Sequence, residues 1–392
     1  MAARKLQVGV IGGGDVAQVV HLPILQLLSH LYITRAICDV SAKTSQHCAS
    51  KFSIPIATTD PEVLFQDKEI DLIFVLTSDE YHAPYTIAAL QAGKSVLVEK
   101  PLTLTIQSAQ AILDAEQAAP EGARVFVGYM RRFAPSLKAF LREMATIGSI
   151  KYARVRDIIG PNSYFIGQSG SYPEKYMDDV SESARQDRQS RLSALLEEAW
   201  GDSLGNLSPA QLDYCCLLAN LGSHGLGVMR EVLGGLPEKV LASTDNARWY
   251  TTMFAYRNRN APHEPFTCLY ETGIDEVPRF DSSVTVYGQN KTVSICYDTP
   301  FVKGLGITVE IDEMNEQGDK VHRSVQTSYE DAYTSELLEL HDCIAGGRAI
   351  KTTALDAVED LKLSRMMMDA YPVEKRGGQN HTGNTRFLRS GP

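Results

Sequence analysis

The chain has 392 residues, 44% of them hydrophobic, and a formal net charge of −10. This length and composition indicate a globular protein of two domains, each large enough to bury its own core. The negative charge argues against a nucleic-acid partner, because nucleic-acid binders usually present a basic face.

The first 128 residues alternate between short apolar segments and helical patterns. The apolar segments are typical of buried strands and cover residues 6–11, 32–40, 72–76, 95–98 and 124–127. Helical periodicity lies between them, for example over 16–28 and 81–92. Strands that alternate with helices in this way predict a parallel sheet with crossover helices. We therefore expect a doubly wound Rossmann domain over residues 1–135.

The pattern changes after residue 148. Alternating segments typical of strands cover 150–159, 238–244, 251–257, 265–273, 282–288, 291–297 and 305–312. A tight hairpin connection is indicated at 287–291, so this sheet is expected to be mostly antiparallel. Two helices, about 331–345 and 354–371, close the domain. The fold class is therefore α/β, with an N-terminal Rossmann domain and a C-terminal α+β domain over 136–373.

Residues 161–215 look like an insertion in the second domain. A charged helical run over 181–200 lies between flanks rich in Gly, Ser and Pro. A solvated surface helix is the favoured interpretation, and a lid or an oligomer contact near the substrate is the alternative. Residues 374–392 are polar without apolar periodicity, so we expect a flexible tail there.

The cysteines and the N-terminus bear on the compartment. Seven cysteines form no CxxC pair and no Cys/His cluster with zinc spacing, so we expect reduced buried thiols and no metal site. A strand begins within a few residues of Met1, which leaves no room for a signal peptide, and no apolar run reaches membrane-spanning length. We expect a cytoplasmic protein without a membrane partner.

A glycine-rich turn joins the first strand to the first helix. Gly12, Gly14 and Ala17 fit the pattern G-x-G-x-x-G/A, with Asp15 and Val16 between them. Such glycines allow a tight turn and let backbone N–H groups approach a pyrophosphate at a helix N-terminus. The string alone is weak, but here it follows a strand and opens a helix. The sequence therefore predicts a dinucleotide-binding site.

Asp39 ends the second predicted strand, 25 residues after Gly14. An acid at this place accepts hydrogen bonds from ribose hydroxyls and repels a 2′-phosphate. NAD is therefore the expected cofactor, and NADP is the alternative because nearby Lys43 could compensate.

A second motif, Glu99-Lys100-Pro101, follows the strand at 95–98 directly. Ligands of open α/β sheets bind at the carboxyl ends of the parallel strands. A lysine held there presents a fixed ammonium group to a substrate oxygen, while Pro101 restricts Lys100 to extended conformations. The placement favours a site role for a tripeptide that is otherwise common on surfaces.

These motifs together resemble one protein family, that of glucose-fructose oxidoreductase and inositol dehydrogenase, known as Gfo/Idh/MocA. The resemblance rests on the order and spacing of 12–17, 71–77, His82, 88–94, 98–101 and 128–135. The second half is similar more loosely, through 221–224 and the closing helices. The resemblance implies a Rossmann domain followed by a sheet-based domain that also builds oligomer interfaces, so we expect a homodimer or homotetramer.

The resemblance also implies catalytic residues. Family members carry the lysine of the E-K-P motif, here Lys100, and a downstream D-x-x-x-H pair. His224 matches the histidine, but Asn220 stands where the aspartate is expected. The implied mechanism has His224 taking the proton of a secondary alcohol, Lys100 stabilising the alkoxide, and Asn220 orienting the imidazole or binding substrate. A neutral Asn220 cannot stabilise an imidazolium, so a lower His224 pKa than in Asp-containing relatives is expected.

Further residues are expected around the cofactor. Thr77 and Ser78 end a strand and are expected to line the nicotinamide or ribose, and Glu99 accompanies Lys100. His82 and Arg132 are secondary candidates near the cofactor and the domain junction, with a structural salt bridge or cap as the alternative for each.

Three functions fit the sequence. The first is an NAD(P)-dependent oxidoreductase for a hydroxyl or carbonyl group of a sugar, cyclitol or similar polyhydroxylated small molecule. The second is a redox-neutral epimerase or eliminase that uses NAD through a transient ketone, which the loss of the aspartate favours. The third is an NAD-binding regulator without catalysis, which the presence of both Lys100 and His224 disfavours.

Overall fold

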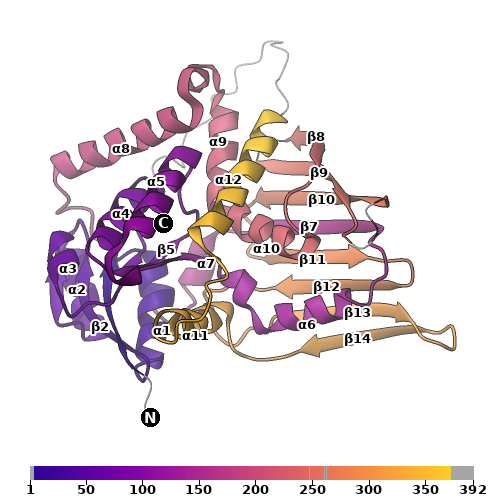
Figure 1. Cartoon of the computed structure of the whole chain (residues 1–392), viewed down its shortest axis with the longest axis horizontal. Helices are drawn as coiled ribbons and strands as arrows, with labels where there is room; N and C mark the ends of the chain where they lie inside the picture. Colours follow the sequence, from indigo (N-terminus) through magenta and orange to yellow (C-terminus); the bar gives the residue numbers. More distant parts are fainter. Residues whose placement is uncertain (1–3, 247, 260, 262, 372–392) are drawn as a thin grey trace.

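Two β-sheets lie side by side in the computed structural model, which describes residues 4–371 except 247, 260 and 262 (Figure 1). The first is a parallel sheet in the order β3-β2-β1-β4-β5-β6. Its strands are β1 Leu6–Ile11, β2 Tyr32–Cys38, β3 Ile56–Thr58, β4 Leu72–Val75, β5 Ser95–Glu99 and β6 Val125–Gly128. This is the doubly wound Rossmann order, and the prediction of that fold is confirmed. The order reverses between β1 and β4, and sheets of this kind bind ligands at the carboxyl ends of the strands at such a point.

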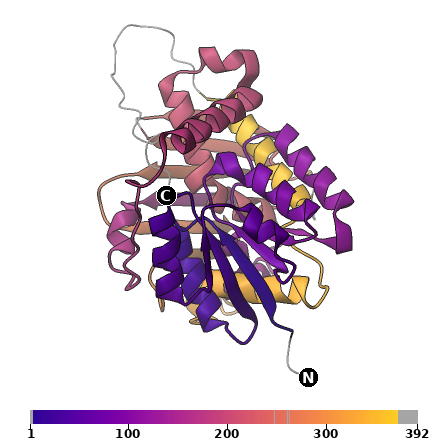
Figure 2. The ribbon, with the colours of Figure 1, turned by 90° about the vertical axis from the view of Figure 1, so that its left-hand side faces the viewer.

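Helices cover both faces of the parallel sheet (Figure 2). They are a π-helical turn at Ala17–His21, α1 Leu22–Leu27, α2 Ala42–Phe52, α3 Glu62–Gln66, α4 His82–Gln91 and α5 Ile106–Ala118. Successive strand residues point to opposite faces of the sheet. Val10 and Phe74 therefore pack in the core that includes α1 and α2, while Ile73 and Val75 pack in the second core, which includes α4 and α5. Burial on both faces explains why these strands read as continuous apolar runs.

The second sheet has eight strands in the order β14-β13-β12-β11-β7-β10-β9-β8, antiparallel except for the β7–β10 pair. They are β7 Tyr152–Ile159, β8 Lys239–Asp245, β9 Trp249–Arg257, β10 Pro265–Ile274, β11 Phe280–Tyr287, β12 Lys291–Tyr297, β13 Thr308–Met314 and β14 Lys320–Gln326. Val155, Val284, Ile295 and Val309 are register partners across four strands, and all are buried. One face of this sheet therefore carries the core, and the other is open.

The remaining helices join the two sheets. They are α6 Pro135–Met144, α7 Asn162–Ile166, α8 Glu182–Trp200, α9 Pro209–Leu217, α10 Ser223–Leu233, α11 Ala332–Ile344 and α12 Ala354–Asp369. The helices α6 and α10 pack on the buried face of the second sheet. The closing helix α12, yellow in Figure 2, returns to the Rossmann domain and packs on α5 and β6. The two domains are thus tied together at the end of the described chain.

Within the segment 161–215, the long helix α8 buries Leu195 and exposes most of its other residues. It lies beside the turn that precedes α4, where Arg188 Nε donates to Glu80 Oε1 at 2.8 Å. Among the described residues, no helix combines the length and apolar character that crossing a membrane requires. The flexible tail expected at 374–392 lies outside the described residues.

Candidate active site

The glycine-rich turn after β1 has the geometry of a pyrophosphate cradle. Gly12 has φ +102°, and a Cβ there would lie 2.5 Å from the Leu76 carbonyl oxygen. A Cβ on Gly13 would lie 2.9 Å from Thr44 Cγ2. The backbone of this turn can therefore pack against Leu76 and Thr44 only because side chains are absent, and its N–H groups stay uncovered by side chains of the turn. Gly14 and Asp15 lead into Val16, which precedes the helical turn, so the residues present fit a dinucleotide.

Asp39 lies next to this turn, at the end of β2. Its carboxylate accepts from Gly13 N at 2.8 Å and from Ser41 N at 2.9 Å. Burial raises the pKa of Asp39, against the effect of these two backbone donors. The carboxylate is thus held beside the phosphate turn, where the sequence predicted a ribose acceptor.

Lys100 crosses the gap between the two domains. It follows β5 directly, precedes Pro101 through a cis peptide bond, and donates from Nζ to the carbonyl oxygen of Asn220 at 2.7 Å. Burial lowers the pKa of Lys100, although the carboxylates of Glu99 and Asp79 act in the opposite direction. The E-K-P lysine of the Rossmann domain therefore reaches the helical segment that carries His224.

His224 occupies the first turn of α10. Burial lowers its pKa well below the ordinary value for histidine, and the charges of Lys100 and Arg131 lower it further. Its Nδ1 atom is buried and has no hydrogen-bond partner among the described residues. The imidazole is therefore neutral at pH 7, which is the state that a proton acceptor needs.

Asn220 does not orient this imidazole. It lies in a π-helical turn, Leu218–Gly222, and its side-chain Nδ2 donates to Cys216 O at 2.9 Å in its own helix. The amide satisfies a local backbone carbonyl, as short polar side chains often do, and it makes no hydrogen bond with His224 Nδ1. The expectation that Asn220 orients the histidine needs correction: its backbone carbonyl holds Lys100, and a contact with substrate stays a prediction.

A buried ion pair beneath His224 was not found from the sequence. Arg131 Nη1 donates to Asp157 Oδ1 at 2.5 Å, and Ser282 Oγ donates to the same oxygen at 2.7 Å. A Cβ on Gly225 would lie 1.9 Å from Asp157 Oδ2, so this carboxylate occupies the space beside the start of α10. The Arg-Arg pair at 131–132 was the only sequence signal, and it did not show which arginine faces the site.

Glu99 supports the lysine from within the Rossmann core. Its Oε1 lies 2.8 Å from His21 Nε2, and its Oε2 accepts from Lys100 N at 3.2 Å. Burial acts to raise the pKa of Glu99, but the hydrogen bond to His21 and the nearby charges hold it below the ordinary value. This carboxylate is thus engaged with two protein partners, and contact with the cofactor stays a prediction.

The loop after β4 is braced against the loop after β5. His82 Nδ1 lies 2.7 Å from Pro101 O, and His82 Nε2 lies 3.0 Å from Thr77 O. Ser78 Oγ donates to Glu80 Oε1 at 2.7 Å, while Thr77 Oγ1 is buried with no partner among the described residues. His82 therefore acts as a brace between the loops, and the unpartnered hydroxyl of Thr77 is the one suited to a ligand.

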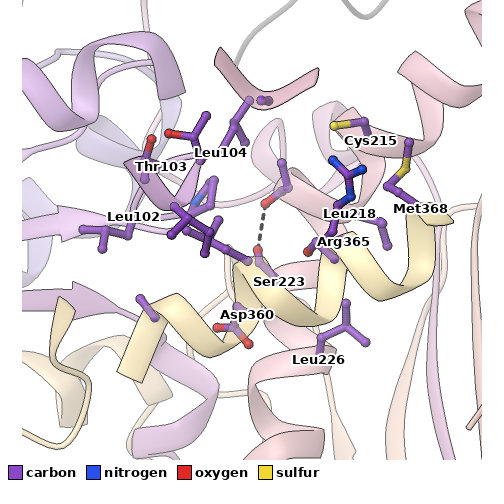
Figure 3. Close-up of a pocket in the computed structure, with 18 of the residues that line it drawn as sticks. Leu102, Thr103, Leu104, Cys215, Leu218, Ser223, Leu226, Asp360, Arg365 and Met368 are labelled. Atoms are coloured by element: carbon purple, nitrogen blue, oxygen red, sulfur yellow. Dashed lines mark hydrogen bonds between the residues drawn. The ribbon is translucent and has the colours of Figure 1, made fainter. Parts of the chain in front are cut away.

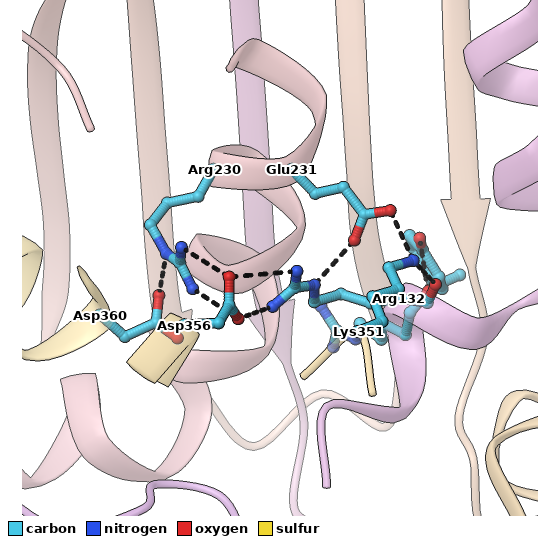
Figure 4. Close-up of polar contacts among 8 residues, drawn as sticks. Arg132, Arg230, Glu231, Lys351, Asp356 and Asp360 are labelled. Atoms are coloured by element: carbon cyan, nitrogen blue, oxygen red, sulfur yellow. Dashed lines mark hydrogen bonds and ion pairs between the residues drawn. The ribbon is translucent and has the colours of Figure 1, made fainter. Parts of the chain in front are cut away.

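Arg132 belongs to a network of ion pairs between the domains (Figure 4). Its Nε donates to Glu231 Oε2 at 2.7 Å, and its Nη1 pairs with Asp356. The other members include Arg230, Lys351 and Asp360, from α10 and the segment around α12. The structure thus places Arg132 in a structural salt bridge, the alternative that the sequence left open, and its nearness to the cofactor stays a prediction.

A cavity of about 390 Å³ borders the site (Figure 3). Leu102 and Leu104 form one wall, and Leu226 of α10 and Met368 of α12 lie opposite. Pro101 and Ser223, the chain neighbours of Lys100 and His224, also line it, but Lys100 and His224 do not. The cavity is therefore an apolar space behind the two motifs and not the place where they meet.

Comparison with known proteins agrees with the geometry of the phosphate turn. Residues 6–129 match the GFO_IDH_MocA family, described as "Oxidoreductase family, NAD-binding Rossmann fold". This match lies within the N-terminal domain. It agrees with the resemblance drawn from the motifs at the start of the chain.

Curated relatives match the same part of the chain. Inositol 2-dehydrogenase from Paracoccus denitrificans is 37% identical over 145 residues, which is 36% of this chain and 42% of that enzyme. Myo-inositol 2-dehydrogenase from Thermotoga maritima is 30% identical over 169 residues, 42% of this chain and 49% of that enzyme. The matches thus span less than half of these relatives.

Solved structures match over nearly the whole chain. KijD10, a 3-ketoreductase from Actinomadura kijaniata in complex with NADP and TDP-benzene, has a TM-score of 0.67 at 16% identity, covering 94% of this chain and 98% of that chain. UDP-N-acetylglucosamine 3-dehydrogenase GnnA from Acidithiobacillus ferrooxidans has a TM-score of 0.66 at 17% identity, covering 94% and 98%. At these identities the likeness establishes the two-domain fold.

Proposed function

We propose that this chain is an NAD(P)-dependent oxidoreductase that acts on a CH–OH group of a sugar, cyclitol or similar polyhydroxylated small molecule. The observation that carries the proposal is the contact of Lys100 Nζ with Asn220 O, 2.7 Å long, at the turn that leads into His224. This contact brings a fixed ammonium group and a neutral imidazole to the carboxyl end of β5. Ligands of doubly wound sheets bind at that edge.

Each of the two residues has a role that follows from its charge state. His224 is neutral because burial and the nearby cations lower its pKa, so it accepts the hydroxyl proton of a secondary alcohol. Lys100 donates a hydrogen bond to the alkoxide oxygen that forms, in a site where burial strengthens the interaction. The phosphate turn and Asp39 would hold a nicotinamide dinucleotide, which would supply the hydride acceptor for oxidation and the hydride donor for reduction. In the reduction of a ketone, His224 gives the proton back.

Two kinds of likeness support the substrate class. The curated relatives of the N-terminal domain oxidise inositol. The structural neighbours with the same two-domain fold include a 3-ketoreductase and a UDP-N-acetylglucosamine 3-dehydrogenase. Inositol and UDP-N-acetylglucosamine both carry a ring with several hydroxyl groups, which is why we propose a polyhydroxylated substrate.

The test is a titration of the purified protein with NAD and with NADP, followed by absorbance at the reduced-nicotinamide band with a panel of cyclitols and sugars. The proposal expects binding of a nicotinamide dinucleotide and growth of its reduced form with one of these compounds. His224→Gln should abolish turnover without loss of cofactor binding, because the phosphate turn is untouched. If neither nucleotide binds, the proposal is wrong.

A redox-neutral reaction is the second candidate, because two observations favour it. His224 has no carboxylate partner at Nδ1, and the insertion lies against the cofactor turn, where it would hinder cofactor exchange. In such an enzyme, hydride leaves and returns to the same substrate. Tight NAD binding with no net reduction, together with exchange of a substrate hydrogen for solvent deuterium, would favour this candidate. Binding with neither reduction nor exchange would favour a regulator.

We also propose that the chain forms a homodimer or homotetramer through the open face of the eight-stranded sheet. This face combines ion pairs, such as Arg154 Nη2 with Glu271 Oε1 at 3.0 Å, with the exposed side chains of Trp249 and Met253. A mixed polar and apolar surface of this kind is typical of protein interfaces. Light scattering on the purified protein tests it, with Met253→Glu as the variant expected to dissociate the assembly.

A further inference from the structure

Residues 171–180 of the insertion, which we call the strap, lie along the edge of the cofactor turn. The strap precedes α8 and connects it to α7. Its central contact is with Gln18, whose side chain is fully buried. Gln18 Nε2 donates to Glu174 O at 2.7 Å, and Glu174 N donates to Gln18 Oε1 at 3.0 Å. The amide thus binds the strap backbone as a neighbouring strand would.

The same glutamine also belongs to the phosphate turn. Gln18 Nε2 donates to Gly13 O at 2.7 Å, so one side chain joins the strap to the backbone that is expected to hold the pyrophosphate. Beside it, Lys175 Nζ pairs with Asp15 Oδ2 at 2.7 Å. A lysine at this place can exchange its carboxylate partner for a phosphate group.

Further along, the strap contacts the start of α2, next to Asp39. Tyr176 N donates to Thr44 Oγ1 at 3.1 Å, and Lys43 N donates to Asp179 Oδ2 at 2.9 Å. The side chain of Lys43 pairs with Asp178. The strap therefore runs from the pyrophosphate end of the predicted cofactor site to its ribose end.

These charges bear on the choice between the two nicotinamide cofactors. Lys43 is the cation that would accept the 2′-phosphate of NADP, but Asp178 already neutralises it. Asp179 adds a second carboxylate, close enough to Asp39 to raise the pKa of Asp39. A 2′-phosphate would meet Asp39, Asp178 and Asp179 together, whereas ribose hydroxyls find acceptors there.

We propose that the strap retains NAD over its adenosine half: Lys175 turns from Asp15 to the pyrophosphate, and Asp178 with Asp179 excludes NADP. This inference rests on the proposed function, which leaves the choice of cofactor open, and it assigns cofactor-binding residues in the insertion. It also gives the insertion a role other than a solvated surface helix. The buried Gln18 contact is the anchor, because exposed ion pairs contribute little by themselves.

The experiment compares two strap variants with the full-length protein. In the first, Asp178→Asn with Asp179→Asn removes both charges and frees Lys43. In the second, Glu174→Gly, Lys175→Gly and Tyr176→Gly loosen the strap without altering the Rossmann domain. Glu182→Gln, an exposed carboxylate in the first turn of α8, is the matched control. Thermal unfolding without nucleotide checks that each variant folds.

Two binding measurements decide the outcome. Calorimetry with NAD and NADP should show that the double Asn variant binds NADP about tenfold more tightly, with NAD affinity nearly unchanged. Stopped-flow displacement of NAD should show dissociation about tenfold faster from the triple Gly variant, because retention is a matter of the dissociation rate. The control should match the parent protein in both.

Contrary results separate this inference from the proposed function. If the parent protein binds NAD but both variants keep its selectivity and dissociation rate, the strap has no role and the oxidoreductase proposal stands. If the triple Gly variant binds NAD more tightly, the strap obstructs the site and the inference is overturned. If the parent binds neither nucleotide, both proposals are wrong.

Discussion

Two groups of buried charges lie close together in this protein, and their chemistry differs. The network around Arg132 joins three cations, Arg132, Arg230 and Lys351, to the carboxylates of Glu231, Asp356 and Asp360 (Figure 4). Every cation of this group touches a carboxylate. In the group around His224, Lys100 Nζ touches a carbonyl oxygen instead, and the imidazole Nδ1 has no partner among the described residues.

The difference teaches how to separate structural from functional charge. Buried charges that are paired hold elements together, because breaking such a pair leaves an uncompensated charge. A half-buried ammonium on a neutral acceptor, near a histidine whose pKa is lowered, keeps its charge available for a substrate. Arg131, the sequence neighbour of Arg132, is itself paired with Asp157, although its charge also lowers the pKa of His224. Substitutions in each group should therefore affect different measured quantities.

The largest effect is expected from Lys100→Met. The loss of the ammonium group should lower kcat/KM for the substrate identified from the panel about 10³-fold, since one preorganised donor to a developing oxyanion contributes about that much. The melting temperature should change little, because the lysine satisfies only one carbonyl. Lys351→Met is the matched control, and it should lower the melting temperature while leaving kcat/KM unchanged. If Lys100→Met and Lys351→Met had equal effects on kcat/KM and on the melting temperature, the distinction between functional and structural charges would be wrong.

Asp356→Asn should give the largest loss of stability. Asp356 pairs with both Arg132 and Arg230, so the change should cost about 3 kcal/mol of unfolding free energy, the scale for a broken buried pair. Although burial acts to raise the pKa of Asp356, Arg132 and Arg230 hold it below its ordinary value. The loss of stability relative to the parent is therefore largest at pH values above the pKa of Asp356 in the unfolded state. It disappears as the pH falls through the lower pKa of Asp356 in the folded state.

Urea unfolding at neutral and at acid pH measures this difference. Asp369→Asn, an exposed carboxylate on the same helix, is the control and should be within about 0.5 kcal/mol of the parent, as surface substitutions are. If Asp356→Asn were as mild as its control, the network would not hold the domains together.

The Rossmann half could be predicted from sequence because its structure follows from local patterns. Strands buried on both faces give continuous apolar runs, and the glycines at 12–14 predict the phosphate turn. The strand β3 was missed because its three residues are too few for a pattern. The strand β14 was missed for another reason: it lies at a sheet edge and buries none of its residues fully, so its apolar alternation is too weak to predict a strand.

The site was predicted where it depends on motifs and not where it depends on distant partners. Lys100 and His224 follow from the family pattern, and the structure brings their segments together. Asp157 lies far from either motif and reaches the site only through the register of β7, which no local pattern reveals. Likewise, the contacts of the strap with Gln18 join residues 156 positions apart. Long-range pairing thus decides what the sequence could not show.

The pH profile of oxidation should be shifted to the acid side. Burial, Lys100 and Arg131 lower the pKa of His224, so the neutral imidazole persists at a pH where an ordinary histidine is protonated. The rate should fall only when pH drops below this lowered pKa. On the alkaline side, the rate should begin to fall at a pH below the ordinary pKa range of lysine, because burial lowers the pKa of Lys100. A kcat/KM profile that is half-maximal at the ordinary pKa of histidine would contradict the assignment of His224 as the base.

Asn220→Asp should have the smallest effect, and it tests the geometry of the pair most sharply. A new carboxylate stabilises the imidazolium and so moves the acid limb of the kcat/KM profile to higher pH. The shift should be less than about one pH unit, because the exposed side chain points to Cys216 O and solvent screens its charge. A shift of about two units or more would mean that the new carboxylate rotates onto Nδ1 of His224. In that case the aspartate-histidine arrangement of the family would be one substitution away, and the contact of Asn220 with Cys216 would be readily exchanged.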